Sequence, residues 1–223
     1  NSTSDATTNE LTINTGAPTA PAVSSASSIT NDTTPTWTWT PGSGGNGTYR
    51  YELNDSDLTS GATTTTGTSH TPAALSEGSH TLFVQERTGA GTWSLSGSFT
   101  VVIDTTVPAV PTIDALTSND TTPTITGTAE ANSDIEVIVN GETVNTTADG
   151  SGNWSATLTV ALADGTYDVA VTSTDAAGNS TSDATTNVLT TDTVAPSVPT
   201  VDTIATNDTT PTITGTAEAN SDI

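Results

Sequence analysis

Oxygen-bearing side chains at turn positions are the residues of this sequence with the clearest chemical potential. The chain carries 25 acidic residues against two basic ones, Arg50 and Arg87, so its formal net charge is −23 at pH 7. Carboxylate, amide and carbonyl oxygens are the ligands that Ca²⁺ takes, in flexible shells of about 6–8 oxygens. The chain has no cysteine, so disulfide bonds, which stabilise many small extracellular domains, are not available to it. Calcium is the expected substitute.

An internal repeat of 88 residues organises the elements that must position these side chains. A 17-residue segment that begins at Asn119 recurs letter for letter from Asn207, and a diverged copy begins at Asn31. A unit of roughly 90 residues is too long for one turn of a solenoid and suits a small β-sandwich. The repeat predicts four segments: residues 1–14, the last strand of a preceding repeat; residues 15–104, repeat one; residues 105–192, repeat two; and residues 193–223, the first strands of a third, incomplete repeat.

Alternating apolar residues, separated by turn residues, predict the strands of each complete repeat. In repeat two, Asn140-Gly141 favours a tight hairpin because both residues tolerate positive φ. The next inward-facing series is expected at Trp154, Ala156, Leu158 and Val160. Tyr167 stands where a tyrosine corner would begin the sixth strand. We therefore expect an all-β fold: tandem seven-stranded antiparallel immunoglobulin-like β-sandwiches joined end to end by short linkers that contain proline.

Strands that run from end to end send successive turns to opposite ends of a sandwich, so several acidic turns should converge. The predicted metal ligands are Asp104, Glu130, Asp134, Asp175 and Asn179 where repeats one and two meet, and Asp192, Glu218 and Asp222 where repeats two and three meet. Repeat one has Thr88 and Thr92 at the positions of Asp175 and Asn179, so no metal is expected before repeat one. For any single acid the alternative is a solvated turn residue, because Asp and Asn favour turns.

The charge and the motifs also exclude several classes of function. A strongly acidic surface repels nucleic acids and anionic membranes, and no apolar run approaches the roughly 20 residues of a membrane span. Acids spread over turns, without a nucleophile and base at catalytic spacing, argue against an enzyme. His70 and His80 are expected to be a surface residue and a substitute for the corner tyrosine, with a zinc pair as the weaker alternative.

Three motifs carry a resemblance to a known family. The linker Asp104–Pro111, the Asn119 block and the Asp-Ala-Ala-Gly-Asn loop at Asp175–Asn179 resemble the bacterial Ig-like repeats of giant RTX-type surface adhesins that are secreted by type I systems. The resemblance implies an extender on the outside of a bacterial cell, which projects a distal binding domain for adhesion or biofilm formation. It also implies that calcium stiffens the joints of a monomeric rod, whose partners are neighbouring repeats of the same chain.

Ligand binding is the main alternative to an extender. Trp37, Trp39, Trp93 and Tyr49 of repeat one could form an aromatic platform for a carbohydrate. The alternation of Trp37 and Trp39 with threonines, however, favours a core position for both. Ice binding by rows of alternate threonines is a further alternative, although such rows also arise on the solvent face of any threonine-rich strand.

Overall fold

The computed structural model describes residues 16–219 and 222, and all the regular elements among them are β-strands. Contacts divide the chain into two compact units. Unit 1 extends to Pro108 and also includes Thr174–Ser180, and unit 2 comprises Ala109–Ser173 and the chain from Thr181 onward. No helix that could cross a membrane occurs in the described residues. The strand predicted for residues 1–14 lies outside them, and the predicted repeat boundaries stay predictions.

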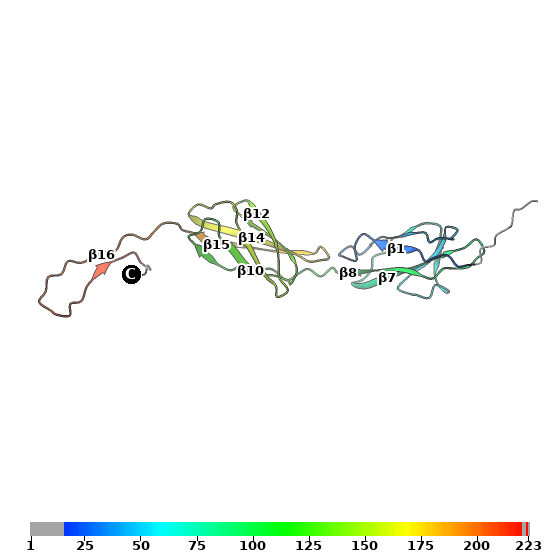
Figure 1. Ribbon diagram of the computed structural model, residues 1–223, viewed down its shortest axis with the longest axis horizontal. Coiled ribbons are helices and arrows are strands. Elements are labelled where there is room, and N and C mark those ends of the chain that lie inside the picture. The colour runs from blue at the N-terminus through cyan, green and yellow to red at the C-terminus, as the bar shows by residue number, and fades with distance from the viewer. Residues whose placement is uncertain (1–15, 220–221, 223) are drawn as a thin grey trace, which may run out of the picture. The chain divides into compact units, whose positions relative to one another are not determined.

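Two sheets face each other across the core of repeat one (Figure 1). The smaller sheet has the order β1-β3-β6 and the larger has the order β2-β8-β7-β4-β5. The strands are β1 (Ala22–Ser25), β2 (Ile29–Thr30), β3 (Trp37–Thr40), β4 (Thr48–Leu53), β5 (Thr63–Thr65), β6 (Ser69–His70), β7 (Gly78–Arg87) and β8 (Gly97–Ile103).

The sandwich of repeat two is built in the same way. Its smaller sheet pairs β10 with β13, and its larger sheet has the order β12-β11-β14-β15-β9. The expected Asn140-Gly141 turn is present, with φ of 47° and 83°, and it places β12 beside β11 in the larger sheet. The strands are β9 (Leu116–Ser118), β10 (Thr124–Thr128), β11 (Asp134–Val139), β12 (Glu142–Thr147), β13 (Asn153–Thr157), β14 (Gly165–Thr174) and β15 (Ser180–Thr191).

Two details of the strands differ from the sequence prediction. Val160 was expected to face inward, but it is 58% exposed, because β13 ends at Thr157 and the chain leaves the sheet before this position. The first strand of each repeat is also not purely antiparallel. Thr112 and Asp114 donate backbone hydrogen bonds to β10, after which the chain crosses to the other sheet and β9 pairs in parallel with β15.

The cores are filled from different strands in the two repeats. In repeat one, β3 supplies Trp37 and Trp39, which are 0% and 3% exposed. In repeat two, the position 88 residues after Trp39 is Gly127, and Trp154 of β13 pairs opposite it. A Cβ atom built on Gly127 would lie 2.6 Å from the Trp154 ring. One indole therefore occupies similar space in both sandwiches, contributed by neighbouring strands.

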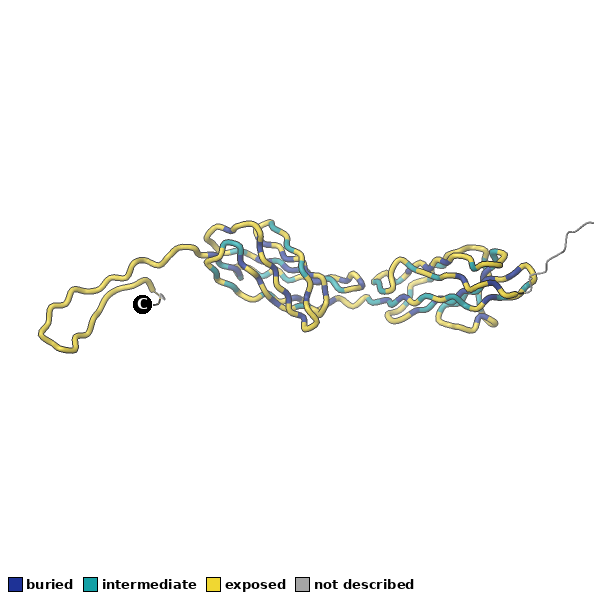
Figure 2. The backbone as a smooth tube through the Cα atoms, in the orientation of Figure 1, coloured by how far each residue is buried: buried dark blue, intermediate teal, exposed yellow. Residues whose placement is uncertain are grey.

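The segment after repeat two contains one short hairpin, β16 (Thr200–Val201) with β17 (Gly215–Thr216). Figure 2 shows this segment exposed along its whole described length, in contrast to the buried stretches of both sandwiches. No second sheet packs against its apolar side chains in the part of this segment that the structure describes.

Candidate metal-binding loops, linker contacts and an arginine cluster

The loop between β14 and β15 is organised by Asp175. Its Oδ1 accepts hydrogen bonds from the backbone N–H groups of Ala177 (2.8 Å) and Asn179 (2.9 Å), and its Oδ2 accepts one from Asn179 Nδ2 (2.9 Å). Partial burial raises the pKa of Asp175, but the hydrogen bonds from Asn179 and Ala177 outweigh it and hold the pKa below its ordinary value. The carboxylate is thus ionised at neutral pH and fixed in orientation.

Asn179 joins this loop to Asp104 within unit 1. Its Nδ2 also donates to the backbone oxygen of Asp104 at 2.9 Å, and the side chain is only 8% exposed. The Asp104 carboxylate accepts a hydrogen bond from Thr106 N–H through Oδ1. The structure therefore brings together three of the predicted ligands: Asp104, Asp175 and Asn179.

The other predicted ligands belong to unit 2 and are exposed. The backbone oxygen of Glu130 accepts hydrogen bonds from Ser133, and Asp134 begins β11. Asp192 Oδ1 accepts from Val194 N–H, and Glu218 Oε2 accepts from Ser197 N–H. Asp222 lies isolated between residues that are not described.

The donor chemistry of Asp104, Asp175 and Asn179 suits a hard cation, since these residues offer only oxygen ligands to a metal. Asp104 Oδ2 accepts no hydrogen bond among the described residues, so this oxygen is available to a cation. Within residues 16–219 and 222, no three acidic or histidine side chains lie close enough to form a metal cluster by themselves. A cation at this loop would therefore take much of its shell from backbone oxygens and water, and the calcium prediction stays a prediction.

A second recurring arrangement fixes the chain as it leaves each sandwich. In repeat one, Glu77 Oε1 accepts hydrogen bonds from Thr105 N–H (3.0 Å), Thr105 Oγ1 (2.7 Å) and Thr106 Oγ1 (2.9 Å). In repeat two, Asp164 Oδ1 accepts from Thr193 N–H (2.9 Å) and Thr193 Oγ1 (2.8 Å). We name each arrangement a linker clamp. The hydroxyl bonds of Thr105 and Thr106 hold the pKa of Glu77 below its ordinary value.

The turn before β7 in repeat one and the turn before β14 in repeat two are closed by the same type of contact from different side chains. Tyr167 Oη donates to the backbone oxygen of Ala163, four residues earlier, at 2.8 Å. In repeat one the same position is His80, whose Nε2 lies 2.8 Å from the backbone oxygen of Ser76, also four residues earlier. His80 is thus the expected substitute for the corner tyrosine, and its other ring nitrogen contacts Asn54.

The proposed aromatic platform of repeat one is wrong for three of its four residues. Trp37, Trp39 and Tyr49 are at most 3% exposed and form the core. Trp93 differs, because it is half-buried beside both basic residues of the chain. The guanidinium carbon of Arg50 lies 4.5 Å from the centroid of its ring, and that of Arg87 lies 5.7 Å from it. The sequence drew attention to Arg50 and Arg87, because they are the only two basic residues among 25 acids, but it did not place them side by side.

One buried acid, Glu86, was not predicted from the sequence. Glu86 is 1% exposed, and its carboxylate accepts hydrogen bonds from the backbone N–H groups of Gly42 (2.8 Å) and Gly47 (3.2 Å) in the glycine-rich loop. Burial, the nearby negative charge of Glu86 and a hydrogen bond to it together raise the pKa of Tyr49. The alternation of β7, in which Leu82 and Val84 face inward, placed Glu86 on the core side.

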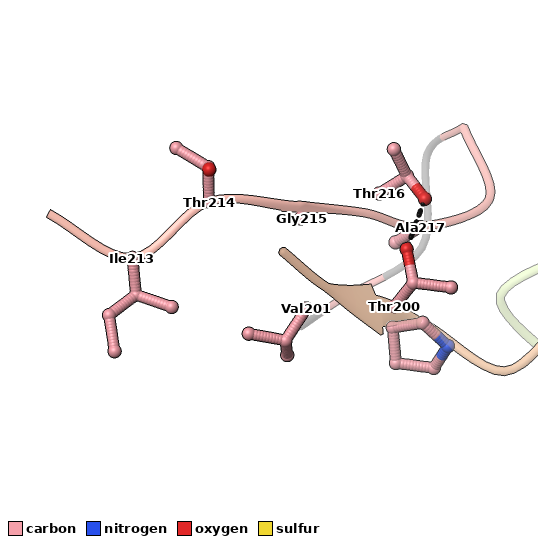
Figure 3. A pocket seen from close by; sticks show the side chains of 8 residues that line it. Thr200, Val201, Ile213, Thr214, Gly215, Thr216 and Ala217 are labelled. Carbon is pink, nitrogen blue, oxygen red and sulfur yellow. Dashed lines mark hydrogen bonds between the residues drawn. The ribbon is translucent and has the colours of Figure 1, made fainter. Parts of the chain in front are cut away.

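A hollow on the last hairpin has apolar and hydroxyl sides (Figure 3). Val201 and Ile213 extend to one side, away from Thr214 and Thr216, and Thr200 Oγ1 bonds Thr216 Oγ1 at 2.6 Å. Val201 and Ile213 stand 88 residues after Ile113 and Ile125, which pack in the core of repeat two. The apolar side of the hollow is thus lined by residues whose equivalents in repeat two lie in a sandwich core.

Comparison with protein families identifies one segment of the chain. Residues 110–193 match the model of the bacterial Ig-like domain, which confirms for this segment the bacterial Ig-like part of the resemblance that the sequence motifs indicated. A comparison with curated proteins gives no match.

Several solved structures are similar to the chain. The fibronectin(III)-like modules of Clostridium thermocellum CbhA share 15% identity, with 76% of this chain and 93% of that chain covered and a TM-score of 0.49. A tetra-tandem repeat in the extending region of a large adhesion protein shares 23% (82% and 52% covered, TM-score 0.36). A Ca²⁺-stabilized adhesin that helps an Antarctic bacterium to bind ice shares 27% (86% and 54% covered, TM-score 0.35). The chain spans about half the length of the two adhesin structures.

Proposed function

We propose that this chain is an extender segment of a bacterial cell-surface adhesin, in which tandem Ig-like sandwiches form a calcium-stiffened rod on the outside of the cell. Its role is mechanical and not catalytic: it holds a distal binding domain away from the surface for adhesion or biofilm formation. The neighbouring repeats of the same chain are its partners, and the rod is monomeric.

The linker clamp is the observation that carries the extender proposal. An acid in the turn before the sixth strand holds the residues that follow the last strand, at Glu77 in repeat one and at Asp164 in repeat two. A hydrogen-bonded exit restricts the first residues of the linker, and the paired prolines Pro108 and Pro111 restrict φ in the residues that follow. A chain with a fixed exit from each domain suits a spacer.

The calcium part of the proposal is supported by the Asp175 loop and by charge. Asp104, Asp175 and Asn179 would hold the ion, with Glu130 and Asp134 as further candidates, and Asp192, Glu218 and Asp222 would contribute to a second site. The ion would supply positive charge to a chain whose formal net charge is −23. Extracellular calcium modules have Kd values of about 10⁻⁴–10⁻³ M, so millimolar calcium would occupy such sites.

Small-angle scattering of residues 15–195, in millimolar calcium and then in excess chelator, tests the proposal. We expect a long, sharply defined maximum dimension in calcium and a broad distribution of dimensions in chelator. Asp175→Ala should give the chelator profile even in calcium. The matched control is Glu136→Ala, which removes an exposed acid on β11 that has no metal role in the proposal.

Identical profiles in both conditions would disprove the calcium joint. If that common profile were extended, the extender function would stand, with the clamps and prolines supplying stiffness. A compact profile in both conditions would exclude the extender itself.

A further inference from the structure

The cationic surface of repeat one is a feature that the extender function does not use. Arg50 and Arg87 are the chain's only basic residues, against 25 acids, and both guanidinium groups lie beside the indole ring of Trp93. We name Arg50, Arg87 and Trp93 the arginine cluster. A random scatter of two cations over such an acidic surface would not be expected to bring both to one aromatic ring.

The arginine cluster lies on the outer face of the larger sheet of repeat one. On β4 the buried residue is Tyr49, so its neighbour Arg50 faces outward, and on β7 the buried Glu86 leaves Arg87 outward. The strand register sets Arg50 opposite Gln85 and Thr48 opposite Arg87, and Trp93 forms a β-bridge with Arg87. The strands themselves therefore hold the three side chains on one surface.

The guanidinium groups are held in position, with one acid near Arg50: hydrogen bonds from Thr59 and, more weakly, the charge of Arg50 lower the pKa of Asp57. Arg50 Nε donates to Gln85 Oε1 at 2.8 Å, and Gln85 Nε2 donates to Ser96 Oγ at 3.2 Å. Within the described residues, no carboxylate forms an ion pair with either arginine, and the guanidinium group of Arg87 has no hydrogen-bond acceptor. Contact with the ring fixes both cations through its negative face, while most of their N–H groups remain available to an oxyanion.

The surrounding side chains favour a sugar over a protein as the carrier of that oxyanion. A stable protein interface needs about 800 Å² on each side around an apolar centre, whereas the neighbours of the cluster are the hydroxyl groups of Thr48 and Ser96, the amide of Gln85 and, at longer range from Arg50, the carboxylate of Asp57. Such groups can bond sugar hydroxyls, while a guanidinium fork binds a carboxylate with two parallel hydrogen bonds.

We propose that the arginine cluster Arg50–Trp93–Arg87 binds the carboxylate groups of an acidic polysaccharide that is built of uronic acid units. Each single contact is exposed to solvent and hence weak, but the two guanidinium groups can engage neighbouring carboxylates of one polymer, so that the second contact forms intramolecularly. The site is independent of the calcium joints and of the extender function, so either can fail without the other.

The test measures binding of the full chain to polygalacturonate by biolayer interferometry, with fully methyl-esterified polygalacturonate as the neutral polymer. We expect binding to the acid form only, and weaker binding as salt rises and screens the charges. The double variant Arg50→Gln/Arg87→Gln should lose affinity by about tenfold or more, since two charge-assisted contacts are removed. Near-ultraviolet circular dichroism would verify that the double variant is folded.

The matched control adds two negative charges elsewhere. Thr143→Glu/Thr186→Glu changes two exposed residues of repeat two, so its net charge equals that of the arginine double variant. We expect this control to bind nearly as the parent does. An equal loss of affinity in both double variants would show that binding depends on net charge and not on the arginine cluster, which would overturn the proposal.

Two further outcomes would overturn it. Equal binding of the esterified polymer would show that the carboxylate is not recognised. Salt-sensitive self-association in analytical ultracentrifugation, abolished by Arg50→Gln/Arg87→Gln and accompanied by no polymer binding, would assign the cluster to a second copy of this chain.

Discussion

At the scale of single residues, the two sandwiches solve the same packing problem with different side chains. Trp39 on β3 and Trp154 on β13 fill corresponding space, and the partner position is small in repeat two, where Gly127 lies beneath the ring. Protein interiors are packed like organic crystals, so an added methyl group at such a position must displace something. A large residue at position 127 is therefore incompatible with a tryptophan at position 154, and the two positions have to change together.

Gly127→Ala should therefore destabilise repeat two. The new Cβ would lie 2.0 Å from the backbone oxygen of Thr112 and 2.6 Å from the Trp154 ring. Neither is the flexible end of a side chain, so we expect a loss of about 1–3 kcal/mol in the free energy of unfolding. Differential scanning calorimetry would measure it as a lower midpoint for the transition of repeat two. Thr143→Ala on an exposed position of β12 is the control, and an unchanged midpoint for Gly127→Ala would contradict the packing argument.

Glu86→Gln should destabilise repeat one. A glutamine side chain presents an amide N–H₂ group where the carboxylate now accepts hydrogen bonds from Gly42 and Gly47. A buried donor left without an acceptor costs about 1–3 kcal/mol. Differential scanning calorimetry should show the transition of repeat one shifted to lower temperature. The exposed Glu136→Gln should leave both transitions in place, and a similar shift in the two variants would rule out a specific role for the Glu86 bonds.

At the scale of elements, the linker clamps explain why acids recur in the turn before the sixth strand. The turn acid is not simply solvated, because it accepts bonds from the residues that follow the last strand of the same sandwich. A single carboxylate thereby ties two segments that are 28 residues apart in repeat one and 29 in repeat two. The clamp is a property of the strand order, which returns the last strand to this end of the sandwich.

The clamp of repeat one should open in acid. The pKa of Glu77 is lowered in the folded state, so its contribution is fully present above the unfolded-state value of about 4.3 and is lost as the pH falls through the lower folded-state pKa. NMR of Thr105 and Thr106 amides should show constant shifts from neutrality to about pH 4.3 and a transition below it. Glu77→Ala should show the open shifts at every pH. A transition that persists in Glu77→Ala would assign the change to another group.

At the scale of the whole molecule, the segment after repeat two repeats the sequence that begins repeat two, but its apolar side chains are exposed. Ile213 is 66% exposed, whereas Ile125, 88 residues earlier, is 1% exposed. The difference is purely tertiary, since both residues lie in the same repeated segment. β10 packs its inward face against β11 and β14, while β17 has no such neighbours among the described residues.

Appending a copy of residues 136–192 after Ile223 should complete a third sandwich. Each large apolar side chain that becomes buried contributes about 1.5–3 kcal/mol, so Val201, Ile204 and Ile213 should become protected together. Hydrogen exchange of peptides across 200–217 would measure this, with rapid exchange expected in the present chain and slow exchange in the extended one. A copy that carries Val137→Asp and Val139→Asp at the appended positions is the control. Slow exchange in the present chain would contradict the description of this hairpin.

The sequence alone determined the periodic and local features. The 88-residue repeat, the alternation of β3, β10, β11 and β14, the Asn140-Gly141 turn and the corner positions of Tyr167 and His80 follow from residue order, because each depends on neighbours in the chain. Only the tertiary structure decided which strand fills the core beside Gly127, which backbone groups Glu86 and Glu77 bond, and that Arg50 and Arg87 meet at Trp93. These depend on distances between segments far apart in the sequence, which the pairing of strands fixes and residue types do not. Val160 shows the opposite error: the alternation of apolar residues continues to this position, but β13 ends at Thr157, so the pattern no longer predicts burial.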